Sequence, residues 1–337
     1  MCASPIWAFE LSSEIAELNK DYGTVLGYPI AVFDKQKFQS FASSARLDWD
    51  DEERLASVMQ TYLKKEHSLS VEISDAQNLV TYVTDLNASA SAIPFFSAGY
   101  PLVMKFCIVM PSGLTGSVVD ETARTLGVRG MEHLYGEVSL DRVSKKFTIE
   151  QLKTVSLYHE LSHCMDRRFL QRAYQGEPDP HSVHMAESFA EVNALVLLAQ
   201  RKQVKGWGQG RALLRGIYSK TLGPFLARQG GFNDNVLQEY GGSIYFLNRS
   251  IEAAERKIAE GIPSAGLDET LALSAQITEQ SALPSRSFRA LHFSFQQGEK
   301  KTLAEYHKLA TEHPDLFRQA YDDLVSVLAT LRSLVYP

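Results

Sequence analysis

The chain has 337 residues, of which 45% are hydrophobic and 22% are charged, and its formal net charge at pH 7 is −6. This composition is typical of a globular protein with a sizeable core. The acidic balance gives no electrostatic reason to expect nucleic acid or an anionic membrane as a partner.

The N-terminal segment and the cysteines bear on location. The segment lacks a basic start and reaches Glu10 and Glu14 before any long apolar run, so it does not resemble a secretory signal peptide. No stretch has the roughly 18 apolar residues of a membrane span. The chain has three cysteines, Cys2, Cys107 and Cys164. Their number is odd and no two of them have CxxC spacing, which favours reduced thiols over a disulfide framework. We therefore predict a cytoplasmic protein, with export that needs no N-terminal signal peptide as the alternative.

The first 145 residues mix helical and strand-like patterns. Helices are predicted over residues 11–22 and 50–66. Short apolar or alternating runs, which favour strands, occupy residues 28–33, 67–74, 102–113 and 136–143. A small sheet with helices among its strands is expected.

After residue 145 the pattern becomes almost entirely helical. Thr148 and Gln151 form a capping-box signal at the start of a helix predicted over residues 149–174. A break containing two prolines follows, and a second helix covers residues 184–202. The predicted fold class is α+β: a small N-terminal sheet with helices, an active-site helix and a mainly helical C-terminal half. The predicted segments are residues 1–145, 146–205 and 206–337.

The stretch "HELSH" carries the chemistry. On a helix, His159 and His163 lie one turn apart on the same face, so their imidazoles can bind one metal ion. Glu160 is then placed to act as general base toward water at that metal. The alternative is that these residues are only a polar stripe on a long helix and bind no metal, since this pentapeptide also occurs by chance.

The next predicted helix offers a third ligand. Glu187 and Glu191 are four residues apart in "ESFAE" and share one helix face. We predict Glu187 as the ligand and Glu191 as a residue that orients the ligands or the water. Two imidazoles and a carboxylate suit Zn²⁺ best among the common metals.

These motifs resemble a known family. "HELSHCMD" resembles the HExxHxxD signature of gluzincin-type zinc metallopeptidases. "ESFAE" resembles the helix that supplies the third ligand in the family of the anthrax lethal factor catalytic domain and in the Mlc titration factor family. The resemblance covers roughly residues 136–195 and implies a zincin-like fold. It also implies zinc bound by His159, His163 and Glu187, with Glu160 as general base and with Asp166 and Glu191 in supporting roles.

No residue stands out as the group that stabilises the oxyanion. The family's tyrosine, a turn or two before the third ligand, has no counterpart here. His184, three residues before Glu187 on the same helix face, is our first choice for this catalytic role. His181, Tyr174 and Tyr240 are the alternatives.

The sequence therefore predicts a zinc-dependent metallopeptidase, an endopeptidase that acts on a protein or peptide substrate. The alternative is a catalytically inactive zincin-like binding module or effector protein. Neither nucleic acid nor a membrane span enters this prediction, and the sequence leaves the oligomeric state unknown.

Overall fold

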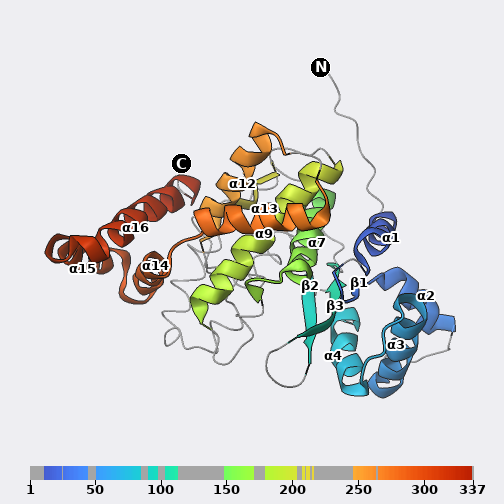
Figure 1. Ribbon diagram of the computed structural model, residues 1–337. Helices are drawn as coiled ribbons and strands as arrows, with labels where there is room; N and C mark the ends of the chain where they lie inside the picture. Colours follow the sequence, from blue (N-terminus) through green and yellow to red (C-terminus); the bar gives the residue numbers. More distant parts are fainter. Residues whose placement is uncertain are drawn as a thin grey trace. The chain divides into compact units, whose positions relative to one another are not determined.

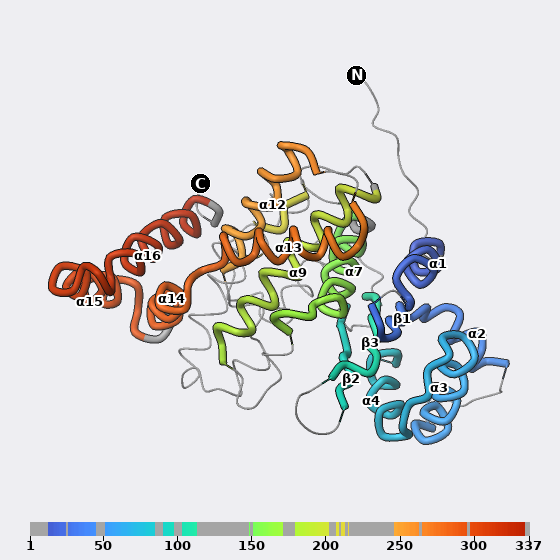
Figure 2. The backbone as a smooth tube through the Cα atoms, viewed as in Figure 1, coloured from blue at the N-terminus to red at the C-terminus, as the bar shows by residue number. Residues whose placement is uncertain are grey.

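The computed structural model describes residues 11–24, 26–44, 51–84, 90–97, 103–112, 148–170, 179–202, 207–208, 210–212, 215, 246–262 and 265–335 (Figure 2). Contacts between residues divide the chain into two compact units. The first comprises Met1–Ser117 and Thr148–Cys164, and the second comprises Val118–Phe147 and Met165–Pro337. The three segments predicted from the sequence have other boundaries, because that prediction followed composition along the chain and the two units follow contacts in space.

The first unit contains a three-stranded sheet of β1 (Ile30–Val32), β2 (Ser91–Phe96) and β3 (Met104–Met110) in the order β1-β3-β2 (Figure 1). β1 runs parallel to β3, and β2 runs antiparallel to it. β3 is buried from residue 106 to residue 110, which confirms the strand predicted within residues 102–113. β2 was not predicted. Its Pro94 lacks a backbone donor, and proline is tolerated on an edge strand such as this one.

Besides α7 (Ile149–Met165), which carries the candidate site, the described part of the first unit contains α1 (Leu11–Tyr22), α2 (Lys35–Ser44), α3 (Glu52–His67) and α4 (Ile73–Thr84). α1 and α3 confirm the helices predicted over residues 11–22 and 50–66, whereas α2 and α4 were missed. Tyr62 of α3 packs its ring edge-on against Phe33 and Phe38, with ring centroids 5.3 Å apart in both pairs. These aromatic rings form the centre of a buried core between the helices and the sheet.

The strand predicted over residues 67–74 is wrong. Ser68 adopts a left-handed conformation with φ of 56° and ends α3, and Leu69 N then donates to Leu63 O at 3.1 Å. Leu69 packs into the core, but Ile73 already begins α4 and is 43% exposed. The alternating apolar residues thus lie in a short connection between α3 and α4 and at the start of α4. They do not form a strand.

The outer edge of β1 is covered by a side chain. Asn19 of α1 donates from Nδ2 to Val32 O and accepts from Val32 N at Oδ1, both at 2.8 Å. The amide replaces a neighbouring strand, because it satisfies both backbone groups of Val32. This contact fixes α1 against the sheet.

The second unit is helical in its described part. It contains α9 (Pro180–Lys202), α12 (Asn248–Glu260), α13 (Leu267–Ser281), α14 (Ser285–Gln297), α15 (Glu299–Glu312) and α16 (Pro314–Val335). α9 contacts α12, α13 and α14, and every residue from 188 to 198 is buried. A helix buried on all sides occupies the centre of its unit. α14, α15 and α16 pack on one another.

The described residues thus form a mixed α+β chain that is mostly helical, with a small sheet in the N-terminal part, as predicted. Over those same residues, no helix combines the length and the apolar character needed to cross a membrane. The strand-like run at residues 136–143 lies outside the described residues.

Candidate metal centre

α7 (Ile149–Met165) carries the "HELSH" motif. Its start is the predicted capping box: Thr148 N donates to Gln151 Oε1 at 2.8 Å, and Gln151 N donates to Thr148 Oγ1 at 3.2 Å. The apolar positions expected to face the core are buried, namely Leu152, Val155, Leu161 and Met165. Packing on these positions determines which way the histidines point.

The two histidines of α7 lie side by side. His159 and His163 are only 3% and 8% exposed, and their Nε2 atoms are 3.1 Å apart. At this distance one ring can donate a hydrogen bond to the other. The same distance is close to the roughly 3.3 Å expected between two ligands of one tetrahedral zinc at about 2.05 Å each.

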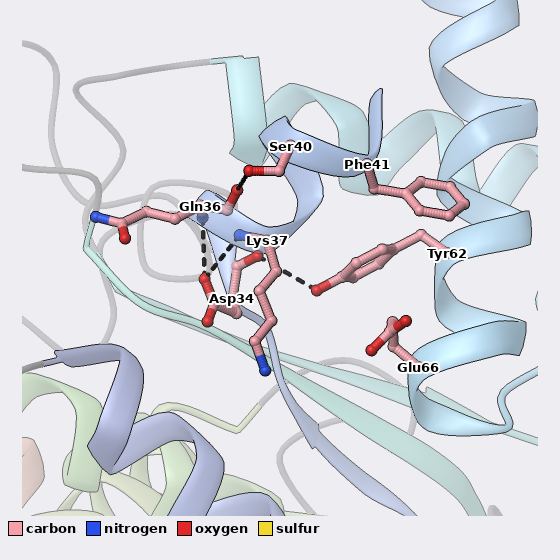
Figure 3. A pocket seen from close by; sticks show the side chains of 7 residues that line it. All are labelled: Asp34, Gln36, Lys37, Ser40, Phe41, Tyr62 and Glu66. Atoms are coloured by element: carbon pink, nitrogen blue, oxygen red, sulfur yellow. Dashed lines mark hydrogen bonds between the residues drawn. The ribbon is translucent and has the colours of Figure 1, made fainter. Parts of the chain in front are cut away.

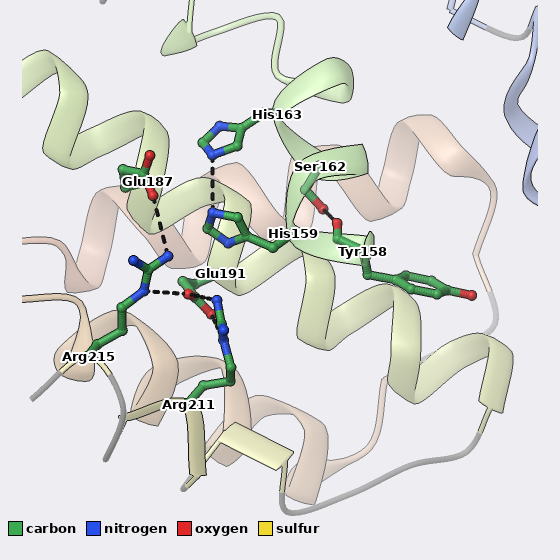
Figure 4. A network of polar contacts seen from close by, with 8 residues as sticks. All are labelled: Tyr158, His159, Ser162, His163, Glu187, Glu191, Arg211 and Arg215. Carbon is green, nitrogen blue, oxygen red and sulfur yellow. Dashed lines mark hydrogen bonds and ion pairs between the residues drawn. The ribbon is translucent and has the colours of Figure 1, made fainter. Parts of the chain in front are cut away.

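Glu187 joins these histidines in a group that can hold a metal ion. One ligand atom from each of His159, His163 and Glu187 lies within 4.8 Å of the others. Figure 4 marks the contact between His163 and His159, and that between Glu187 and Arg215. The sequence prediction named this set, and within the described residues it is the one group of metal-binding type that meets these distances.

Glu160 is half-buried and contacts the sheet. Its Oε2 accepts a hydrogen bond from Ala92 N of β2 at 2.7 Å. Within the described residues, β2 is an edge strand that pairs with β3 on one side. The bond gives the Glu160 carboxylate a fixed orientation.

The cysteine prediction is wrong, because Cys107 of β3 and Cys164 of α7 form a disulfide. Cys164 is adjacent to His163, and its carbonyl accepts a hydrogen bond from Tyr28 Oη at 2.7 Å. Two links thus hold the last turn of α7, one to the central strand and one to the segment before β1. Disulfides are rare in the reducing cytosol, so the cysteines no longer support the cytoplasmic prediction.

Asp166 ends α7 earlier than predicted. Its Oδ1 accepts from Arg168 N and Phe169 N at 2.9 and 2.7 Å, and its Oδ2 accepts from Leu170 N at 2.9 Å. These three bonds favour a new turn over continuation of the helix to residue 174. The carboxylate therefore caps the turn that follows α7, which is a structural role.

Glu191 takes part in a buried charge network that the sequence did not reveal. It accepts from Arg211 Nε at 3.1 Å, from Arg211 Nη2 at 2.5 Å and from Arg215 Nε at 2.8 Å (Figure 4). Arg215 Nη2 also lies 3.5 Å from Glu187 Oε2. The signal in the sequence was the spacing, since the two arginines are four residues apart, as are the two glutamates.

The side chain of His184 contacts the backbone of Leu283 and has a structural role. It is 1% exposed, and its Nε2 accepts a hydrogen bond from Leu283 N at 3.0 Å, so this nitrogen cannot donate to an oxyanion. Burial, assisted by the charges of His181 and Arg249, lowers the pKa of His184 to about 3, against a smaller opposing effect of Glu187. We assign His184 no catalytic step. His181 Nε2 is engaged with Leu283 O at 2.9 Å, and residues 174 and 240 lie outside the described residues.

A pocket of the first unit lies between α2 and α3 (Figure 3). Asp34 accepts from Gln36 N and Lys37 N at 3.0 Å, and its carbonyl accepts from Tyr62 Oη at 3.4 Å. Burial, and then the carboxylates of Asp34 and Glu66, raise the pKa of Tyr62 above its ordinary value. These contacts fix the start of α2, and none of the predicted site residues lines this pocket.

No protein-family model matches the chain, and it has no match among curated proteins or solved structures. Fold and site together define a mostly helical α+β chain with a buried His, His, Glu group that can hold a metal ion.

Proposed function

We propose that the protein is a zinc-dependent metallopeptidase with a zincin-like fold, acting on a protein or peptide. One observation carries the proposal: a ligand atom from each of His159, His163 and Glu187 lies within 4.8 Å of the others. The general base expected beside such a site, Glu160, directly follows the first histidine in α7.

The donor set fits zinc. Two imidazoles and one carboxylate are the ligands of many catalytic zinc sites, which keep a further position for water or substrate. The separation of 3.1 Å between the histidine nitrogens differs from the tetrahedral value by only a few tenths of an ångström. All three side chains are buried or half-buried, so few water molecules compete for them.

The reaction would depend on the residues as follows. A zinc ion at this site supplies Lewis acidity, which makes water nucleophilic near neutral pH. The Glu160 carboxylate accepts the proton of the attacking water and delivers it to the amine that leaves. Its bond with Ala92 N keeps one oxygen toward β2, which orients the carboxylate before the substrate arrives.

The alternative, a binding module without turnover, also has an observation in its favour. Glu160 Oε2 is already engaged by the backbone of β2, and a carboxylate held only for that contact has a structural role. The peptidase needs Glu160 as a general base, whereas the binding module needs it only for its contact with β2.

The test is Glu160→Gln in zinc-loaded protein, assayed against a library of quenched fluorescent peptides. The amide can still accept from Ala92 N but cannot take a proton, so we expect zinc to be retained and hydrolysis to fall by about 10²- to 10⁴-fold. Glu252→Gln, on an exposed face of α12, is the matched control and should leave the rate unchanged. Parent protein that binds zinc but cleaves no peptide would favour the binding module. Equal hydrolysis by parent and Glu160→Gln would contradict the assigned general base.

A further inference from the structure

We infer that Arg215 positions Glu187 as a metal ligand, and that the buried pair of Glu191 and Arg211 holds Arg215 in place for this role. The inference rests on the proposed function, because it concerns the same metal site. It assigns roles to two residues that lie outside the recognised motifs.

The network begins with a pair that water does not reach. The Glu191 side chain is fully buried and that of Arg211 is 2% exposed. Arg211 donates to both carboxylate oxygens of Glu191, through Nε to Oε2 and through Nη2 to Oε1. Such a two-point contact fixes the relative orientation of the guanidinium and the carboxylate.

Arg215 joins this pair and extends it toward Glu187. Its Nε donates to Glu191 Oε1 at 2.8 Å, and its Nη2 lies 3.5 Å from Glu187 Oε2. Arg215 therefore contacts both glutamates. Its guanidinium is rigid and planar, so fixing Nε on Glu191 also fixes where Nη2 lies.

The charges of the network favour this arrangement. Both guanidinium groups contact the carboxylate of Glu191, and that of Arg215 also lies beside the carboxylate of Glu187. A nearby carboxylate stabilises a guanidinium that is largely removed from water. The charge of Arg215 therefore attracts Glu187 and restricts the rotamers that it adopts.

A carboxylate that is already oriented loses less side-chain freedom when it binds a metal. Arg215 would then strengthen metal binding without touching the metal. If the ion pair instead competed with the metal for Glu187, removal of Arg215 would have the opposite effect. The sign of the change in zinc affinity separates the two roles.

The experiment measures zinc affinity at fixed pH by competition with a chromophoric chelator. Arg215→Met should weaken zinc binding about 10-fold or more, as is usual when a residue that supports a metal ligand is lost. Arg215→Lys should recover part of this loss, because the ammonium keeps the charge but cannot hold both glutamates in a fixed geometry. Arg318→Met, which removes an exposed ion pair with Asp322 on α16, is the matched control and should leave the affinity unchanged.

A second measurement distinguishes positioning from general damage. The absorption spectrum of the cobalt-substituted protein reports ligand geometry, so we expect it to change in Arg215→Met and to return toward the parent in Arg215→Lys. If Arg215→Met does not fold, Arg215→Lys is compared with the parent alone. The inference then predicts that Arg215→Lys binds zinc more weakly than the parent and that its cobalt spectrum differs from that of the parent.

Each outcome bears on a separate claim. A parent that binds no zinc overturns the proposed function, and this inference with it. A parent that binds zinc while Arg215→Met binds it equally or more tightly overturns the inference alone. A loss of affinity that lysine does not reduce, with an unchanged cobalt spectrum, also overturns it, because it points to general damage.

Discussion

The two helices that carry the proposed metal ligands are held by different kinds of interaction. The last turn of α7 is fixed by a covalent link, Cys107–Cys164, and by the hydrogen bond from Tyr28 to the Cys164 carbonyl. The glutamates of α9 are fixed by the guanidinium groups of Arg211 and Arg215.

This difference determines what disrupts each helix. A disulfide stabilises chiefly by restricting the unfolded chain, so its effect depends on the redox conditions and little on the neighbouring charges. A buried charge network stabilises only while every member is present, since the loss of one leaves another without compensation. The α9 side should therefore respond more strongly to a single substitution, and the α7 side should respond to a reductant.

The largest expected effect is that of Arg211→Met. Breaking the buried pair with Glu191 should lower the free energy of unfolding by about 3 to 5 kcal/mol, measured by urea denaturation. Arg318→Met, at an exposed pair, should change it by about 0 to 1 kcal/mol. If both variants lose less than about 1 kcal/mol, the network does not hold α9 and the contrast between the helices disappears.

Removal of the disulfide should come next. Cys107→Ala with Cys164→Ala opens a loop of 57 residues and should destabilise the protein by about 2 to 4 kcal/mol in non-reducing buffer. A reductant should lower the melting temperature of the parent and leave that of the double variant unchanged, and Cys2→Ala should behave as the parent. Identical melting of parent and double variant in both buffers would mean that the thiols are reduced, as the odd cysteine count first suggested.

His184 should make stability depend on pH. Because burial holds its pKa near 3 in the folded state, against about 6.5 when unfolded, only the unfolded chain takes up a proton between these values. Stability from this group is therefore present above pH 6.5 and is lost as the pH falls, by about 2 kcal/mol at pH 5. In His184→Gln the difference in the free energy of unfolding between pH 7 and pH 5 should shrink by that amount. An unchanged difference would show that His184 titrates normally.

The smallest effect is expected at Asp166, which caps the chain after α7. Asp166→Ala removes the acceptor for three backbone N–H groups and should lower the free energy of unfolding by about 0.5 to 2 kcal/mol. Asp166→Asn keeps a carbonyl oxygen and should lose less. Equal losses in the two variants would argue that the charge of the carboxylate, and not its role as acceptor, matters here.

Local patterns predicted the part of the site that depends on local geometry. The spacing of His159 and His163 was informative because helix periodicity fixes which residues share a face. The start of α7 was equally local, since the capping box of Thr148 and Gln151 depends on four consecutive residues.

The rest depended on contacts between distant residues. Pairing of Cys107 with Cys164 requires β3 to lie beside α7, which no pattern in either segment specifies. Arg211 and Arg215 follow Glu187 by 24 and 28 residues, and their spacing is informative only once the glutamates are known to be buried. β2 escaped prediction for a similar reason, because Pro94 argues against a strand unless its place at the sheet edge is known.

The most direct test of the metal site is zinc content, measured by elemental analysis of protein purified without chelator. One variant is taken from each helix: His163→Ala from α7 and Glu187→Ala from α9. We expect about one zinc per chain in the parent and a loss in both variants, since a site of three protein ligands needs all of them. A parent without metal even after zinc is supplied would contradict the account, and "HELSH" would then be a helical segment with two buried histidines.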